Sequence, residues 1–100
     1  MDVLVCYDVS TEDAAGRRRL RQVAKVCIAF GQRVQKSVFE CSVNDMQLLL
    51  MRSRLLNCID PKTDSLRVYR LVEPREQHVE SYGRDTYVDF EGPLVLGGRT

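Results

Sequence analysis

The stretch VLVCYDVS at residues 3–10 predicts a β-strand whose two faces are both apolar. Alternate side chains of a strand point to opposite faces, here Val3, Val5 and Tyr7 on one side and Leu4 and Cys6 on the other. A strand of this kind needs a covering layer on each face, because large exposed apolar patches are rare in monomeric proteins. The stretch ends in a carboxylate, Asp8, which calls for a separate explanation.

The segment after this strand predicts an amphipathic helix that ends near Gly31. Ser10 or Thr11 is expected to cap the helix, with Glu12 and Asp13 near its positive end, and Gly31 is expected to end it in a left-handed conformation. One apolar stripe recurs at helical spacing and consists of Leu20, Val23, Ala24, Cys27 and Ile28.

The following segments predict two short strands, a second helix and a last strand. QRVQKSVFECSV is rich in β-branched and aromatic residues and is expected to break near Gln35 and Lys36. Asn44 and Asp45 are expected to cap a helix that Pro61 ends, with an apolar side formed by Leu48, Met51, Leu55 and Ile59. SLRVYRLV is expected to be a strand.

The order βαββαβ predicts an α+β protein with a ferredoxin-like fold, in which both helices cover one face of an antiparallel sheet. The first strand is central in that topology, so its second apolar face would be exposed to water in a monomer. A two-fold homodimer that packs sheet against sheet would cover it. The alternative is that the two-sided pattern is only an edge effect of a short strand.

The C-terminal tail has no place in a closed four-stranded sheet. DTYVDFEGPLVL at residues 85–96 contains two strand-like pieces whose apolar side chains need burial. We therefore predict a ferredoxin-like domain at residues 1–82, and a C-terminal strand and tail at residues 83–100 that packs on the partner protomer.

Composition and cysteine spacing narrow the classes of protein that remain. The N-terminus lacks a secretion signal and no apolar run is long enough to span a bilayer, so an intracellular protein is expected. The four cysteines contain no C-x-x-C pair and lie in apolar patterns, which favours free buried thiols over a zinc cluster. The lone His78 lies in a polar segment and is expected at the surface.

Basic residues are concentrated in one part of the chain. From Ala14 to Phe39 there are seven Lys or Arg and no acid, whereas six acids lie between Glu73 and Glu91. A charge run is usually a solvated face, but such faces normally mix signs. We therefore expect nucleic-acid phosphates to bind the following side chains: Arg17, Arg18, Arg19, Arg21, Lys25 and Lys36.

Asp8 is open to two interpretations. A single Asp at the end of a strand most often makes a turn or a cap. In a two-fold dimer, however, two Asp8 carboxylates would converge, and like charges this close require a cation or a shared proton. One Mg²⁺ ion, bridged by Asp8 of both chains, would suit such a pair and could activate water against a phosphodiester. Arg17, Arg19 and Arg33 could then hold the phosphate.

The chain also resembles a known family, the small second subunit of the CRISPR spacer-acquisition module, and its tail resembles the subtype I-C branch. The resemblance rests on VCYDVS, AGRRRLRQVAK, RVQKSVFE at residues 33–40 and EGPLVL. It implies a symmetric dimer that acts as a metal-dependent endonuclease on RNA or double-stranded DNA. It also implies that Asp8 binds the metal, with Tyr7 as its catalytic neighbour, and that Arg33 and Phe39 belong to the active-site cleft. One or two arginines of the first helix contribute as well, for which Arg17 and Arg19 are favoured.

Three functions therefore remain possible. The first is a slow nuclease that uses one Mg²⁺ ion bridged by Asp8. The second is a non-catalytic scaffold that grips a DNA duplex for the integrase subunit, which the resemblance places at the acidic tail, residues 85–96. The third is a small regulatory module that binds a metabolite, against which the exposed basic helix argues.

Overall fold

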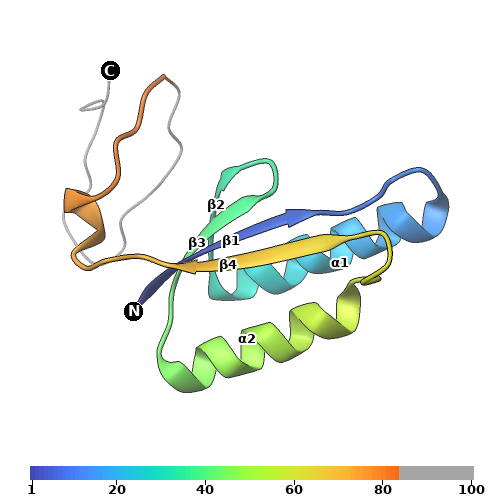
Figure 1. Ribbon diagram of the computed structural model, residues 1–100, viewed down its shortest axis with the longest axis horizontal. Coiled ribbons are helices and arrows are strands. Elements are labelled where there is room, and N and C mark those ends of the chain that lie inside the picture. Colours follow the sequence, from blue (N-terminus) through green and yellow to red (C-terminus); the bar gives the residue numbers. More distant parts are fainter. Residues whose placement is uncertain (84–100) are drawn as a thin grey trace.

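The computed structural model describes residues 1–83, which form a four-stranded antiparallel sheet with two helices on one face (Figure 1). The elements in chain order are β1 (Asp2–Asp8), α1 (Ala14–Phe30), β2 (Gly31–Gln35), β3 (Val38–Ser42), α2 (Asp45–Cys58), β4 (Ser65–Arg70) and the short 3-10 helix η1 (Arg75–Gln77). The sheet order β2-β3-β1-β4 places β1 inside the sheet. The predicted ferredoxin-like α+β fold is therefore confirmed.

The predicted division of the chain at residue 82 stays a prediction. Of the predicted C-terminal strand and tail at residues 83–100, all but Gly83 lie outside the described residues. Within the described part of the chain, no helix is both long and apolar enough to cross a membrane.

The two ends of α1 differ from the prediction. Its N-cap is Asp13, whose side chain accepts a hydrogen bond of 2.7 Å from the Gly16 amide, and not Ser10 or Thr11. Gly31 does not adopt a left-handed conformation, because its φ is −167° and it already belongs to β2. A glycine is needed there for a different reason: a Cβ atom would collide with the Glu40 carbonyl oxygen and the Cys41 Sγ.

The second helix and the β2–β3 hairpin agree more closely with the elements predicted from the sequence. Asn44 caps α2 in a capping box, in which its side chain accepts from the Gln47 amide and the Gln47 side chain accepts from the Asn44 amide. The strands β2 and β3 break at Lys36 and Ser37, with a register irregularity between Arg33 and Gln35.

The hydrophobic core lies between the sheet and the two helices. It consists of Val3, Val5, Tyr7, Val9, Val23, Cys27, Phe39, Cys41, Val43, Leu48, Met51 and Leu55. Burial raises the pKa of the Cys27 and Cys41 thiols to about 12 and about 11, so both stay protonated at neutral pH. Ile28, predicted in the apolar stripe of α1, is instead exposed, and Ile59 follows α2 as a half-buried cap.

The sheet face that points away from α1 and α2 is called the open face below. Leu4 and Cys6 lie on it half-buried, as the two-sided pattern of β1 predicted. Their cross-strand neighbours are Glu40 and Tyr69 for Leu4, and Val38 and Arg67 for Cys6. The open face therefore combines an apolar centre with charged side chains, and no second helical layer in residues 1–83 covers it (Figure 1).

Candidate metal and nucleic-acid site

Asp8 is the last residue of β1, and its side chain is exposed. It pairs in register with Ser65, the first residue of β4. Because Tyr7 faces the helices, Asp8 faces the opposite side and lies at the end of the open face. Among the described residues, no ion pair or side-chain hydrogen bond occupies its carboxylate.

Tyr7 and Phe39 lie in the core under the helices. Tyr7 is 5% exposed and Phe39 is fully buried, and their rings stack with centroids 6.2 Å apart. The Tyr7 amide donates to the Ser37 carbonyl at 3.1 Å, and the Tyr7 hydroxyl lies 3.5 Å from the Lys36 carbonyl. Burial raises the pKa of the Tyr7 hydroxyl. In a single chain the side chains of these two residues therefore support the β2–β3 turn and lie on the face of the sheet opposite to the Asp8 side chain.

Arg33 extends this stack toward solvent. It is exposed on β2, and its guanidinium lies 5.1 Å from the centre of the Phe39 ring, a cation–π contact. The residues predicted for one cleft are thus divided by the sheet within one chain: Asp8 lies on the open face, and Arg33, Phe39 and Tyr7 lie on the helix-covered side.

The predicted phosphate-binding residues also fall into distinct environments. Arg18, Arg21 and Lys25 are exposed and point outward on α1; we call them the basic face. Arg17 donates to the Thr11 carbonyl at 3.3 Å and so holds the loop before its own helix. Lys36 is exposed at the β2–β3 turn.

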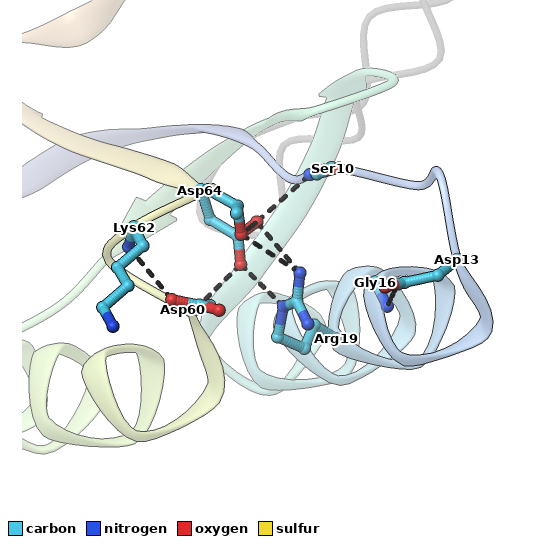
Figure 2. Close-up of polar contacts among 8 residues, drawn as sticks. Ser10, Asp13, Gly16, Arg19, Asp60, Lys62 and Asp64 are labelled. Carbon is cyan, nitrogen blue, oxygen red and sulfur yellow. Dashed lines mark hydrogen bonds and ion pairs between the residues drawn. The ribbon is translucent and has the colours of Figure 1, made fainter.

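Arg19 differs from its neighbours because it forms an ion pair with a buried acid, Asp64 (Figure 2). The Arg19 Nε lies 2.8 Å from the Asp64 Oδ2, and the Asp64 side chain is 0% exposed. The sequence gives no signal for the role of Asp64, because this residue lies in the polar loop DPKTDS between α2 and β4. One signal existed for Arg19: it lies four residues before the buried Val23, hence on the inner side of the helix.

The Asp64 carboxylate accepts hydrogen bonds from four residues. Besides Arg19, these are the amides of Ser10 at 3.1 Å and Asp60 at 2.8 Å, and the Thr63 hydroxyl at 3.1 Å. Burial alone would raise the pKa of Asp64, but these hydrogen bonds outweigh it and lower the pKa to about 2.

This shift predicts acid-sensitive stability. A carboxylate with a lowered folded-state pKa contributes stability that is complete above its unfolded pKa of about 4 and is lost as pH falls toward about 2. We expect the free energy of unfolding, measured in urea, to fall between about pH 5 and pH 2 more steeply in the wild type than in Asp64→Asn. Asp45→Asn, an exposed acid on α2, is the control and should keep the wild-type slope. Equal slopes in Asp64→Asn and the wild type would contradict this role of Asp64.

A metal ion at Asp8 would need ligands beyond one copy of residues 1–83. No group of three His, Cys, Asp or Glu side chains in this part of the chain could hold a metal ion. The exposed Asp8 carboxylate does fit a magnesium ion as one oxygen ligand, because Mg²⁺ takes few carboxylates and keeps several waters.

These features define a class: a small ferredoxin-like α+β domain with a free carboxylate at the end of its open face and an exposed basic helix. The family model described as "CRISPR associated protein Cas2" matches residues 1–79, and the chain belongs to this family. The predicted family is thereby confirmed, whereas the subtype stays a prediction.

Relatives and solved structures agree with this family. The chain is 59% identical, over 96% of its length and all of the relative, to "CRISPR-associated endoribonuclease Cas2 1" of Moorella thermoacetica. It is 47% identical, over 96% of its length and all of the relative, to "CRISPR-associated endonuclease Cas2" of Halalkalibacterium halodurans. The crystal structure of Streptococcus pyogenes Cas2 at pH 6.5 superposes with a TM-score of 0.76 and 54% identity, covering 83% of this chain and all of that one.

Proposed function

We propose that this chain acts in CRISPR spacer acquisition as a homodimer that binds nucleic acid and cleaves phosphodiester bonds. The observation that carries the proposal is the exposed Asp8 carboxylate, which no described side chain occupies, at the end of a sheet face left uncovered by the helices. The family and the nuclease names printed for the two relatives support the same activity. A prokaryotic cytoplasm is the corresponding location.

The dimer is proposed to form through the open face. Leu4 and Cys6 are only half-buried there, and Tyr69 beside Leu4 is 43% exposed. A second copy that packs on this face in two-fold symmetry would cover its apolar centre. Asp8 lies at the end of the same face, so the two carboxylates would approach each other where an axis passes near the strand ends.

One Mg²⁺ ion per dimer is proposed to bind both Asp8 carboxylates. When bound, the ion would supply an activated water and stabilise the charge that develops on the phosphate. The protein's own part is to hold the two carboxylates at the end of rigid central strands. No further general base lies on the described strand ends beside Asp8, which favours slow cleavage.

The basic face of α1 is proposed to bind the phosphate backbone. Arg18, Arg21 and Lys25 point to solvent, and no acid lies in their helix between Ala14 and Phe30. An exposed, unbalanced cationic row of this kind binds phosphates without sequence preference. The substrate class is therefore a nucleic acid held by its backbone, either RNA or double-stranded DNA.

Reversing the charge of Arg18 and Arg21 together tests this surface. The double variant Arg18→Glu/Arg21→Glu is expected to weaken duplex binding and to lower the slope of log K against log salt by about 2, because each lost phosphate contact lowers it by about one. Fluorescence anisotropy at several salt concentrations measures both quantities. Arg52→Glu/Lys62→Glu, with the same charge change on exposed sites outside α1, is the matched control. An affinity and slope unchanged from the wild type would exclude the basic face.

A non-catalytic scaffold is the second candidate, and the shortage of catalytic groups beside Asp8 favours it. In this role the dimer bridges copies of the integrase subunit around a DNA duplex, and the integrase docks on the acidic tail at residues 85–96, which lies outside the described residues. Both candidates require the basic face and the dimer. They differ in whether the dimer cleaves the nucleic acid with Asp8 or only holds it.

A further inference from the structure

The Asp64 carboxylate joins the two backbone segments that surround Asp8. Its Oδ1 accepts the Ser10 amide at 3.1 Å, and Ser10 is the second residue after Asp8. Asp64 also directly precedes Ser65, which pairs with Asp8 across the sheet. One side chain therefore fixes both the exit of β1 and the entrance of β4, the two positions that determine where Asp8 lies.

A second contact restricts the same segment from the other side. The first turn of α1 lies so close to the chain that a Cβ atom on Gly16 would collide with the Ser10 carbonyl oxygen. Val9, between Asp8 and Ser10, is 7% exposed and belongs to the core. The Asp8 side chain is thus exposed, while the backbone that carries it has little freedom to move.

The Arg19 side chain points toward Asp64 and does not extend into solvent (Figure 2). Its Nε donates to the Asp64 Oδ2 at 2.8 Å, and its second nitrogen lies 3.4 Å from the Oδ1 and 3.3 Å from the Thr63 hydroxyl. A phosphate contact by Arg19 would leave the buried Asp64 carboxylate without its charged partner, which is costly. The hydrogen bonds that Arg19 donates to Asp64 also raise the pKa of Arg19, so it stays charged.

We propose that Arg19 and Asp64 are a positioning pair that fixes Asp8 for cleavage, and that Arg19 acts through Asp64 and not as a phosphate ligand. The inference rests on the proposed function for its effect on cleavage. The structural part of the inference, that the pair holds the segment from Asp8 to Ser10, does not depend on the proposed function.

The kinetic test compares Arg19→Gln, Asp64→Asn and the double variant. Each single variant is expected to lower kcat by about 10- to 100-fold through misplacement of Asp8, with the Kd for the nucleic acid unchanged. The double variant is expected to be no worse than either single one, because both remove the same interaction. Arg19→Lys, which keeps the charge next to Asp64, should recover part of kcat. Arg52→Gln and Asp45→Asn are matched controls on the exposed side of α2 and should behave as the wild type.

Two kinetic results would overturn the proposal. If Arg19→Gln weakens nucleic-acid binding and lowers its salt dependence while Asp64→Asn does not, Arg19 is a phosphate ligand. If the losses in kcat multiply in the double variant, the two residues act separately. All assays are made at a temperature at which far-UV circular dichroism shows every variant folded.

Amide hydrogen exchange, followed by NMR, tests the pair without any cleavage. In Arg19→Gln and Asp64→Asn the Ser10 amide is expected to exchange at least about tenfold faster than in the wild type and the controls, because its acceptor is lost or loosened. Unchanged Ser10 exchange would overturn the positioning pair. If the wild type shows no cleavage that depends on Asp8, the proposed nuclease fails, and the Ser10 exchange still decides the present inference.

Discussion

Asp8→Ala is expected to lower Mg²⁺-dependent cleavage by about 1,000-fold. A bound metal activates water and stabilises developing charge, so its loss removes several kcal/mol of transition-state stabilisation. Asp8 is exposed and contributes no side-chain hydrogen bond within the described residues, so the fold should be unaffected. Duplex affinity is expected to stay within about twofold of the wild type, because the basic face of α1 is unchanged.

Asp8→Ala is tested in three separate assays, which together distinguish a nuclease from a scaffold. They measure duplex binding, Mg²⁺-dependent cleavage of RNA and of duplex DNA, and spacer integration with the integrase subunit. Asp2→Ala, at the other end of β1 and on the same face, is the matched control and should cleave normally. Loss of cleavage with integration intact would favour the scaffold as the cellular role. Cleavage that persists in Asp8→Ala would contradict the proposed metal site.

Phe39→Ala is expected to cost about 3–5 kcal/mol of unfolding free energy, the usual range for removing a fully buried ring. Phe39 is 0% exposed, stacks on Tyr7 and lies under the Arg33 guanidinium, so its loss leaves a cavity between β1, β3 and α1. A domain of this size has only about 5–15 kcal/mol in total, so this one change removes much of its stability. Urea unfolding followed by circular dichroism measures the difference.

Val38→Ala is the control, because Val38 is the preceding residue of β3 and faces the half-buried open side. Its cost should be about 1 kcal/mol, the lower end expected for a partly buried aliphatic side chain. Phe39→Leu then separates a structural role from a direct one. It keeps most of the apolar volume, and cleavage per folded molecule should match the wild type. Lost cleavage in a stable Phe39→Leu protein would show that the ring itself acts in the site.

The sequence predicted the fold because the relevant signals are local. Period-two alternation in residues 3–8 and helical spacing in α1 and α2 both depend on neighbouring residues, and the element order follows from them. The helix caps were harder. Ser10, Thr11 and Asp13 are all suitable caps, and α1 begins directly after Asp13, whereas the Ser10 amide donates to Asp64 of a distant loop.

Within the candidate site, the sequence could predict only which side chains face the open side of the sheet, because strand alternation determines this. Asp8 lies on the open face for this reason, opposite to Tyr7. The resemblance grouped Tyr7, Arg33 and Phe39 with Asp8, whereas in one chain the sheet separates them. The pairing of Arg19 with Asp64 joins residues 45 apart in sequence, and no periodicity within α1 could reveal such a partner.

A calorimetric titration with Mn²⁺, used as the probe for Mg²⁺, tests the shared carboxylate site most directly. If two chains pair through their open faces and share one ion between their Asp8 side chains, the titration should give half an ion per chain for the wild type and no binding for Asp8→Ala. A stoichiometry of one ion per chain, or binding that survives in Asp8→Ala, would contradict the shared site.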